Sequence, residues 1–390
     1  MRVSAGAVVS AARRASAIGA ERIHAAAAWS LIYLLFQAGL GLAWDIGWHR
    51  SVGRDTFWTP PHVLLYSGVA LGGLVCLAVV LFDSVARGDD SADDTLAIVG
   101  PLRAPLGFAL AGFGYLTLLA AAPLDDYWHR LYGLDVTLWA PFHMMGLIGA
   151  AIAGTGATYA IASCAARARR AHVSVRVLEA GVVLALAGLL DNLLVIAQPS
   201  AALYPTTQLL GVEVLTFPVL LAAFVTPILF AAARAVAFRF AATGVVGVLV
   251  ARDLFFALVT PAVVRIVAGI EGTAFRTARP PEFQPVPLVV PLLLLVPALL
   301  VDVRLRAEPS RRADASLVAA ALVAIGTTYV VWVRRSISRA DLPPELAALL
   351  PTADPVALAI LLAIPLAVAA AALSAPLGDG WGRLLRLNPH

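Results

Sequence analysis

Two stretches of the chain place one carboxylate and two imidazoles at fixed spacings. In the first stretch, Asp45 is followed by His49 four residues later and by His62 after two prolines. Residues four apart on a helix lie on one face, one turn apart, so Asp45 and His49 can act together. Proline is favoured in the first turn of a helix, which puts His62 near the start of the next helix. One carboxylate and two imidazoles with open positions form a ligand set suited to copper, zinc or non-haem iron.

A second stretch repeats this arrangement. Both stretches run in the order Asp, Trp-His-Arg, Gly, Asp, Trp, Pro, His, and one residue is inserted in the second. We interpret this agreement as an internal repeat of a helix–loop–helix unit. The sequence therefore predicts two metal sites at neighbouring helix ends. The expected ligands are Asp45, His49 and His62 in the first triad and Asp125, His129 and His143 in the second triad.

Neighbouring residues are expected to orient these ligands rather than to bind the metal. A carboxylate that accepts a hydrogen bond from a ligand histidine fixes the ring and raises its basicity. Arginines beside the motifs can balance the charge of the carboxylates. The residues expected in this supporting role are Asp55, Asp135, Arg54, Trp48, Trp128 and Asp126.

The histidines allow two other interpretations. Each Asp–His pair could be a hydrogen-bonded anchor at a membrane interface, with the nearby tryptophans in an aromatic belt. The paired histidines are 13 and 14 residues apart, a separation that also suits the axial ligands of a haem on one continuous helix. Gly53 and Pro60 interrupt the first stretch, and Gly133 and Pro141 interrupt the second. Haem ligation also leaves the aspartates without a role. The combination of aspartates, helix breaks and histidines therefore favours a non-haem metal site.

The elements that must position these residues are membrane helices. Of 390 residues, 61% are hydrophobic and 13% are charged, about half the charged share of a soluble domain. A net charge of +4 indicates topology rather than a nucleic-acid surface. We predict an all-α polytopic bundle of about ten spans. The expected spans are 24–44, 61–82, 102–123, 139–163, 174–197, 211–233, 243–268, 285–303, 314–333 and 354–376.

Arginine-rich loops orient this bundle. Four groups, including Arg13 and Arg14, Arg167, and Arg304, fall on the face that carries the N-terminus, whereas Arg334 falls on the other. By the positive-inside rule we expect a multi-pass plasma-membrane protein with a cytoplasmic N-terminus and both motifs towards the outer face. The expected organisation is a cytoplasmic amphipathic segment over 1–22, with a signal peptide as the alternative, a duplicated four-helix metal-binding half over 23–165, and further transmembrane helices over 166–390.

Ionisable residues inside the predicted spans are a second candidate site, since charges in a bilayer are costly. Mutual pairing is the simpler explanation, for example of Asp191 or Glu213 with Arg252. The candidates are Glu179, Asp191, Glu213, Arg252 and Asp253.

The first stretch resembles the C subunit of the copper membrane monooxygenases, the particulate methane and ammonia monooxygenase family. The family's metal-site stretch has the form Asp-x2-Trp-His-x4-Arg-Asp-Thr-x-Phe-Thr-Pro-x-His, and the chain has Trp58 where the family has Phe. The resemblance implies copper ligation by the first triad. The matching residues are Asp45, Trp48, His49, Arg54, Asp55, Thr56, Thr59, Pro60 and His62.

The same subunit has a second copper site made by an Asn, a His four residues later and a further His fourteen residues after that. The second triad reproduces this spacing with Asp125 in place of the Asn, which makes the site more anionic. The resemblance covers about 40–165, and 166–390 carries no motif of the family.

These observations lead to three hypotheses. The first is a divergent copper-dependent monooxygenase, or a subunit of one, that acts on a small apolar substrate. The second is a non-catalytic membrane copper carrier, store or sensor, and the third is a metal-free transporter or scaffold. Copper is the expected cofactor, ahead of iron or zinc. The expected partners are membrane lipid, other membrane or cupredoxin-like subunits and further copies of the chain, and no nucleic acid.

Overall fold

The fold was analysed in a computed structural model of the chain. The structure describes residues 5–53, 56–87, 95–132, 138–276, 280–304, 311–336, 347–348, 350 and 357–387, with backbone alone for 5–18, 86–87, 311–314 and 387. Among these residues are ten helices long and apolar enough to cross a membrane, which confirms the expected all-α multi-pass bundle. They are α1 (Ala5–Ser51), α2 (Pro60–Leu81), α3 (Leu106–Tyr132), α4 (Pro141–Arg170), α5 (Arg176–Ala197), α7 (Thr216–Ala235), α8 (Ala241–Ile270), α9 (Val286–Arg304), α10 (Arg311–Ser336) and α12 (Ala357–Leu387).

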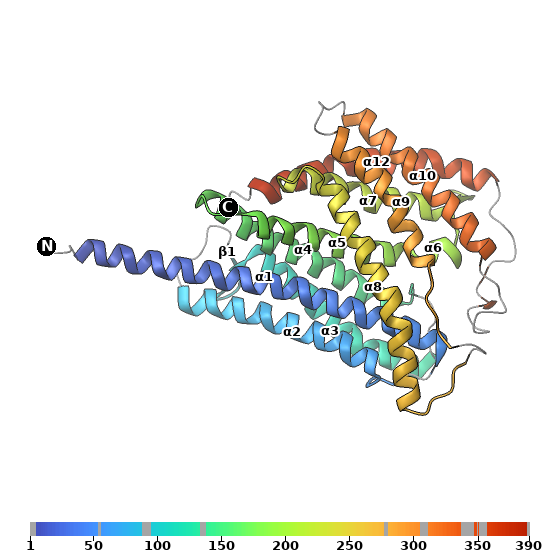
Figure 1. Ribbon diagram of the computed structural model, residues 1–390, viewed down its shortest axis with the longest axis horizontal. Coiled ribbons are helices and arrows are strands. Elements are labelled where there is room, and N and C mark those ends of the chain that lie inside the picture. Colours follow the sequence, from blue (N-terminus) through green and yellow to red (C-terminus); the bar gives the residue numbers. More distant parts are fainter. Residues whose placement is uncertain are drawn as a thin grey trace.

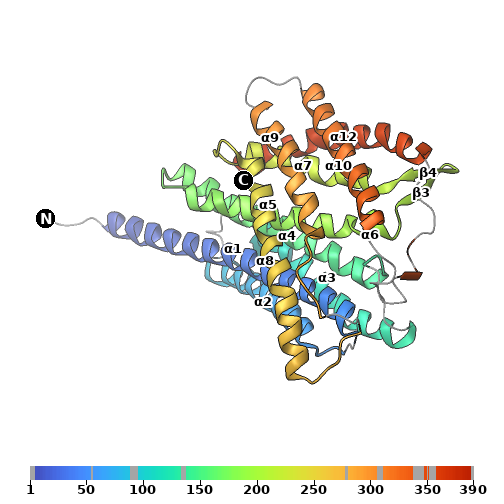
Figure 2. The same ribbon diagram turned by 45° about the vertical axis from the view of Figure 1, so that its right-hand side comes forward.

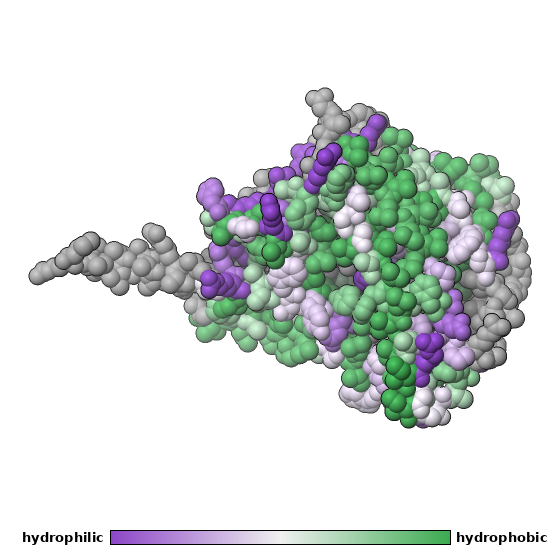
Figure 3. Space-filling model, in the orientation of Figure 1, coloured by the Kyte–Doolittle hydropathy of each residue, from purple (hydrophilic) through white to green (hydrophobic). Residues whose placement is uncertain are grey.

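The surface of this bundle is that of a membrane protein. On the face shown in Figure 3, hydrophobic residues cover most of the area between polar residues gathered towards the ends. Large apolar side chains such as Leu74 and Leu77 of α2 and Leu116 of α3 are half-exposed or more. Such side chains face hydrocarbon favourably in a bilayer and have no reason to be exposed in water.

The first four helices form two antiparallel pairs. Helix α1 packs on α2, α3 packs on α4, and the pairs meet along α2 and α3 and along α1 and α4 (Figure 2). The last residues of α1 and α3 and the first residues of α2 and α4 lie at the same end of the bundle (Figure 1). Both metal motifs occupy that end. Helix α1 is continuous from Ala5, and its start projects beyond the other helices.

Glycines set the distance between the helices of each pair. A Cβ added at Gly68 of α2 would lie 2.9 Å from the Leu34 carbonyl oxygen of α1. A Cβ at Gly149 of α4 would lie 3.0 Å from the Gly114 carbonyl oxygen of α3. Each glycine is six residues after the second histidine of its motif, and each carbonyl is eleven residues before the aspartate. The two pairs therefore pack in the same register, with the close backbone approach typical of small residues in membrane helices.

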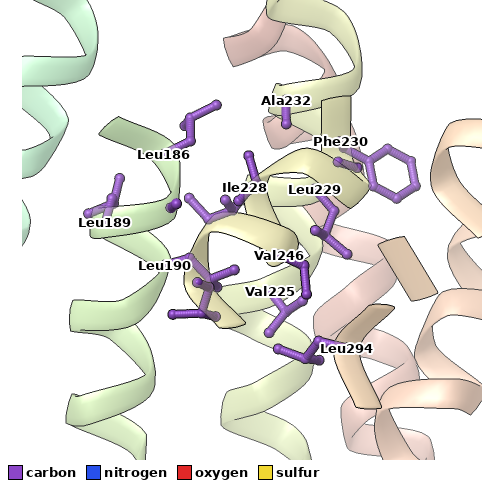
Figure 4. Packing of buried hydrophobic residues seen from close by; sticks show 14 of the residues in the cluster. Leu186, Leu189, Leu190, Val225, Ile228, Leu229, Phe230, Ala232, Val246 and Leu294 are labelled. Carbon is purple, nitrogen blue, oxygen red and sulfur yellow. The ribbon is translucent and has the colours of Figure 1, made fainter. Parts of the chain in front are cut away.

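The largest buried cluster runs through the whole bundle and includes residues of the first four helices, such as Leu31, Phe108 and Ile161. It is centred on α5, α7 and α8, where Leu186, Leu190, Val225, Leu229 and Val246 interdigitate (Figure 4). Helix α12 crosses α7 closely, because Gly378 leaves room for the Pro227 backbone. Helices α5, α8 and α12 pack along the α1 and α4 sides of the four-helix unit.

Two β-hairpins were not expected from the sequence. One is formed by β1 (Thr95–Val99) and β2 (Leu102–Pro105), and the other by β3 (Thr206–Leu209) and β4 (Val212–Leu215). Leu210 and Gly211 form the turn of the second hairpin with φ values of 51° and 82°. Other short elements are η1 (Phe82–Arg87), a π-helix, and α6 (Pro199–Ala202).

The second hairpin corrects the start of the sixth predicted span. The helix begins at Thr216 rather than 211, so Glu213 lies on β4, exposed at the bundle end, with its carboxylate 3.4 Å from Gln208 Nε2. The expectation that Glu213 lies within a span and pairs with Arg252 is wrong. Run length alone included Glu213 because valines and leucines surround it, but their alternation with polar residues is a strand pattern.

Candidate metal centres

The second triad lies where α3 ends and α4 begins. Asp125 and His129 occupy successive turns at the end of α3, and His143 lies in the first turn of α4, after Pro141. The ligand-type atoms of the three side chains all lie within 4.8 Å of one another. Both histidine Nε2 atoms approach Asp125 Oδ1, at 3.8 Å for His129 and 3.4 Å for His143.

These separations fit a metal ion better than they fit hydrogen bonds. Two ligand atoms, each about 2.1 Å from one metal at a tetrahedral angle, are about 3.4 Å apart. Asp125 Oδ1 is buried, yet it accepts no hydrogen bond of good geometry from any residue in the described ranges. A buried carboxylate oxygen normally has such a partner. The three side chains remain 11–25% exposed, which leaves positions open for an external ligand.

The first triad lies at the equivalent place on α1 and α2. Asp45 and His49 end α1, and His62 begins α2. Asp45 Oδ1 lies 3.2 Å from His62 Nε2, and Asp45 Oδ2 lies 3.4 Å from His49 Nδ1. Haem ligation in either stretch would need one continuous helix that carries both histidines. In the structure, the two histidines of each stretch lie on two different helices.

A backbone contact fixes the tautomer of His62. Its Nδ1–H donates to the Thr56 carbonyl oxygen at 3.2 Å, so the Nε2 lone pair of the neutral ring faces Asp45 Oδ1. A nitrogen lone pair and a carboxylate oxygen repel each other unless a proton or a metal cation lies between them. Asp45 Oδ1, like its counterpart in the second triad, is buried without a hydrogen bond of good geometry from the described residues.

His49 makes the first triad looser than the second. Its Nδ1 lies 3.1 Å from the carbonyl oxygen of Asp45 on its own helix, to which Nδ1–H can donate. The rings of His49 and His62 are 6.3 Å apart between centroids, against 5.6 Å for the second triad. In this orientation His49 would ligate a metal shared with His62 only after its ring turns.

The first triad is supported by α8 and the segment that follows it. Trp48 is 1% exposed and packs with Val264 and Ala268 of α8. Further along, the Arg276 backbone N–H donates to the Ser51 carbonyl oxygen at 2.7 Å. These contacts hold the end of α1 from outside the four-helix unit.

The second triad is supported by α5 and the residues after it. Trp139 Nε1–H donates to the Ile196 carbonyl oxygen at 2.8 Å, and its ring stacks on Tyr204. Asn192 Nδ2–H donates to the Leu147 carbonyl oxygen of α4 at 2.9 Å, one turn after His143. The α4 end is thus tied to α5.

The structure describes three of the six residues expected to support the triads. Trp48 contacts α8, and the Trp128 ring contacts the rings of Tyr132 and Phe142. Asp126 pairs with Arg130, one turn along the outside of α3. The remaining three, Arg54, Asp55 and Asp135, lie outside the described residues.

The intramembrane ionisable residues pair with one another. Arg252 Nη1 of α8 contacts Asp191 Oδ1 of α5 and lies 3.0 Å from Asp253 Oδ1. We name Asp191, Arg252 and Asp253 the acid–arginine cluster. Glu179 is buried elsewhere, where its carboxylate accepts hydrogen bonds from Arg169 at 2.9 Å and from the Ala237 N–H at 3.3 Å. The predicted pairing of Asp191 with Arg252 is confirmed, whereas Glu179 joins α4 to the segment between α7 and α8.

One buried pair escaped sequence reasoning. His24 of α1 and Asp83 of η1 are 1% and 0% exposed, and His24 Nε2 lies 3.0 Å and 3.2 Å from the two carboxylate oxygens. Phe82 and Phe108 pack around the imidazole. His24 stands in an alanine-rich run and Asp83 in an acidic one, so only the tertiary contact reveals the pair.

Fold and site together define a multi-pass α-helical membrane protein with a possible metal-ligand triad at the end of α3 and α4. Comparison of the chain with protein-family models, with curated proteins and with solved structures found no match.

Proposed function

We propose that the protein is a copper-binding integral membrane protein, and that it works as a divergent, C-subunit-like component of a copper-dependent monooxygenase. The observation that carries the proposal is the convergence of both imidazoles of the second triad on one buried carboxylate oxygen. The first triad would hold a second metal ion. Copper held there would supply redox chemistry towards dioxygen and a small apolar substrate.

Ligand chemistry supports copper over other metals. Imidazole and carboxylate ligands suit copper, zinc and iron, and the affinity order of divalent metals peaks at copper. The resemblance of the first motif to the copper membrane monooxygenases points the same way. Iron and zinc remain the alternatives that elemental analysis would detect.

The shared helix register supports the interpretation of the two pairs as copies of one unit. The Gly68 and Gly149 contacts are formed by residues at matching distances from the two motifs, two to three helical turns outside the motifs themselves. Agreement at this range is expected of a duplicated helix pair and has no reason to arise from two unrelated interface anchors.

Metal retention and turnover test the proposal. The purified protein should hold copper, and His129→Ala should remove the metal of the second triad together with dioxygen-dependent oxidation of a short alkane. His172→Ala is the matched control, because His172 is exposed in the turn after α4. Oxidation that survives in a copper-free His129→Ala protein would rule the activity out. Electron supply by a cupredoxin-like subunit, and an outer-face position of both triads, belong to the same proposal.

A membrane copper carrier, store or sensor is the second candidate. It is favoured by the acid–arginine cluster, since buried acids in α5 and α8 could belong to a conduction path. With three methionines and two cysteines in the chain, a thioether or thiolate path for Cu(I) has few possible ligands. Copper binding without dioxygen consumption would select this function, and a metal-free preparation would select a transporter or scaffold.

A further inference from the structure

The acid–arginine cluster joins three helices within the spanning region. Asp191 is on α5, Arg252 and Asp253 are on α8, and a Cβ at Gly39 of α1 would lie 2.6 Å from Arg252 Nη2. All three charged side chains are 12–15% exposed. The guanidinium lies over the Phe256 ring, 4.1 Å from its centroid. Arg252 is about 17 Å from the nearer end of α8 at a rise of 1.5 Å per residue, so the cluster lies well inside the apolar part of that helix.

Its formal charge is not balanced. Two carboxylates and one guanidinium sum to −1, and an uncompensated charge in an apolar surround is costly. Arg252 is paired with both carboxylates, and Asp191 and Asp253 repel each other. From α1 the cluster faces Gly39, which carries no charge, and Asn192 beside it is engaged with the α4 backbone. No other cation among the described residues neutralises the cluster.

A proton is the cation that this arrangement accepts. A metal cation needs several oxygen ligands around it, but here the guanidinium of Arg252 already lies between the carboxylates and would repel it. A proton needs one lone pair on one carboxylate oxygen. Protonation of a carboxylate to a carboxylic acid makes the cluster neutral and leaves one Asp–Arg pair intact.

The cluster also lies between the two triads. Asn192, next to Asp191, is bonded to α4 one turn from His143, while Arg252 packs on α1. Thr260, two turns further along α8, contacts Gly47 of α1 close to the first triad. Thr260 Oγ1 and Trp44 Nε1 are both buried in this α1–α8 interface and have no hydrogen-bond partner among the described residues. Of these two groups, the Thr260 hydroxyl can both accept and donate a hydrogen bond, as a proton relay through hydrogen-bonded water requires, whereas the Trp44 indole N–H can only donate to such a water.

We propose that Asp191, Arg252 and Asp253 form an intramembrane proton-binding site that holds one exchangeable proton and delivers it towards the first triad past Thr260. The site is distinct from both metal sites. Oxygen chemistry and ion transport both consume or move protons, so the site has a role in either of the functions proposed above.

Infrared difference spectroscopy on the metal-free, full-length protein in lipid nanodiscs tests this proposal without reference to metal or activity. In acidic buffer the wild type should show the carbonyl band of about one carboxylic acid per chain from the cluster. In alkaline buffer this band should disappear. Asp253→Asn and Asp191→Asn should each abolish this band, because the remaining Asp–Arg pair is neutral. Arg252→Gln should instead about double it, because two carboxylates then lack a cation.

Asp126→Asn is the control, since Asp126 is paired with Arg130 on the outside of α3. A band that persists in both Asn variants, or that is absent from the wild type, would show that the cluster is a static ion cluster and overturn the proposal. Arg252→Gln should enlarge the band, whereas the two Asn variants should abolish it. This difference in direction distinguishes loss of the proton from loss of the fold. Thr260→Val should keep the proton count and slow exchange after a pH jump, and an unchanged rate would overturn the route.

Discussion

The two helix pairs carry the same ligand types at the same helix positions, but their triads differ. In the α3–α4 pair both imidazoles approach one oxygen of Asp125, whereas in the α1–α2 pair they approach different oxygens of Asp45. The first pair is held by α8 through Trp48, and the second by α5 through Trp139. A local motif thus determines which residues meet, while the neighbouring helices determine how tightly they meet.

The largest difference should appear when the tryptophan of each motif is removed. Trp48→Ala should destabilise the protein by about 3 kcal/mol, because a fully buried ring between α1 and α8 leaves a cavity. Trp128→Ala should cost clearly less, since Trp128 is only partly buried. Thermal unfolding in detergent measures both changes. Equal losses would mean that the two pairs are supported alike.

Removal of one histidine should act on one triad only. We expect His129→Ala to weaken metal binding at the second triad at least ~100-fold and to leave the first triad loaded, because each triad lies between its own pair of helices. His49→Ala should do the reverse. Elemental analysis and competitive titration with a chelator follow both sites. Loss of all metal from either variant would contradict two independent sites and indicate one shared site.

A larger side chain at Gly68 or Gly149 should push the two helices of its pair apart. The two substitutions therefore test whether both pairs pack in the same register. Gly149→Leu and Gly68→Leu should each destabilise the protein by about 2 kcal/mol, because a side chain there meets backbone atoms of the facing helix. Unfolding midpoints of the two variants should therefore shift alike. Gly188→Ala on α5 is the control, since nothing lies within 4 Å of its added Cβ. A large shift from one glycine and none from the other would argue against equivalent pairs.

The smallest effect is expected when one carboxylate oxygen of the second triad is replaced by an amide nitrogen. Asp125→Asn keeps the shape of the side chain and removes its charge. Metal should stay bound with about 10-fold weaker affinity, because a charged ligand gives way to a neutral one. Chelator competition measures the change. Unchanged affinity would mean that the carboxylate charge does not contribute to binding.

Sequence reasoning worked where the cause was local. Ten apolar runs predicted ten spans because the thickness of a bilayer fixes the length of a helix. The two-helix arrangement of each triad followed from Gly and Pro between the histidines. The same reasoning placed Glu213 inside a span because run length cannot separate an apolar strand from the first turn of a helix.

The contacts between distant segments could not be predicted in this way. Asp302 of α9 accepts hydrogen bonds from the Ala242 and Thr243 N–H groups at the start of α8, and this pairing spans about sixty residues. The His24–Asp83 pair and the ring stacking of Trp139 on Tyr204 are of the same kind. No local spacing encodes them, since each depends on which helices become neighbours.

The sequence by itself determined that this is a membrane bundle, and it named the six residues of the two triads, because hydrophobicity and helical periodicity act over a few turns. Only the tertiary structure decided that the second triad converges on one oxygen, that the His49 ring faces its own helix, and that Asp191 and Asp253 share one arginine. Those outcomes depend on side-chain packing between helices far apart in the chain, where differences of an ångström separate a ligand set from an ion pair.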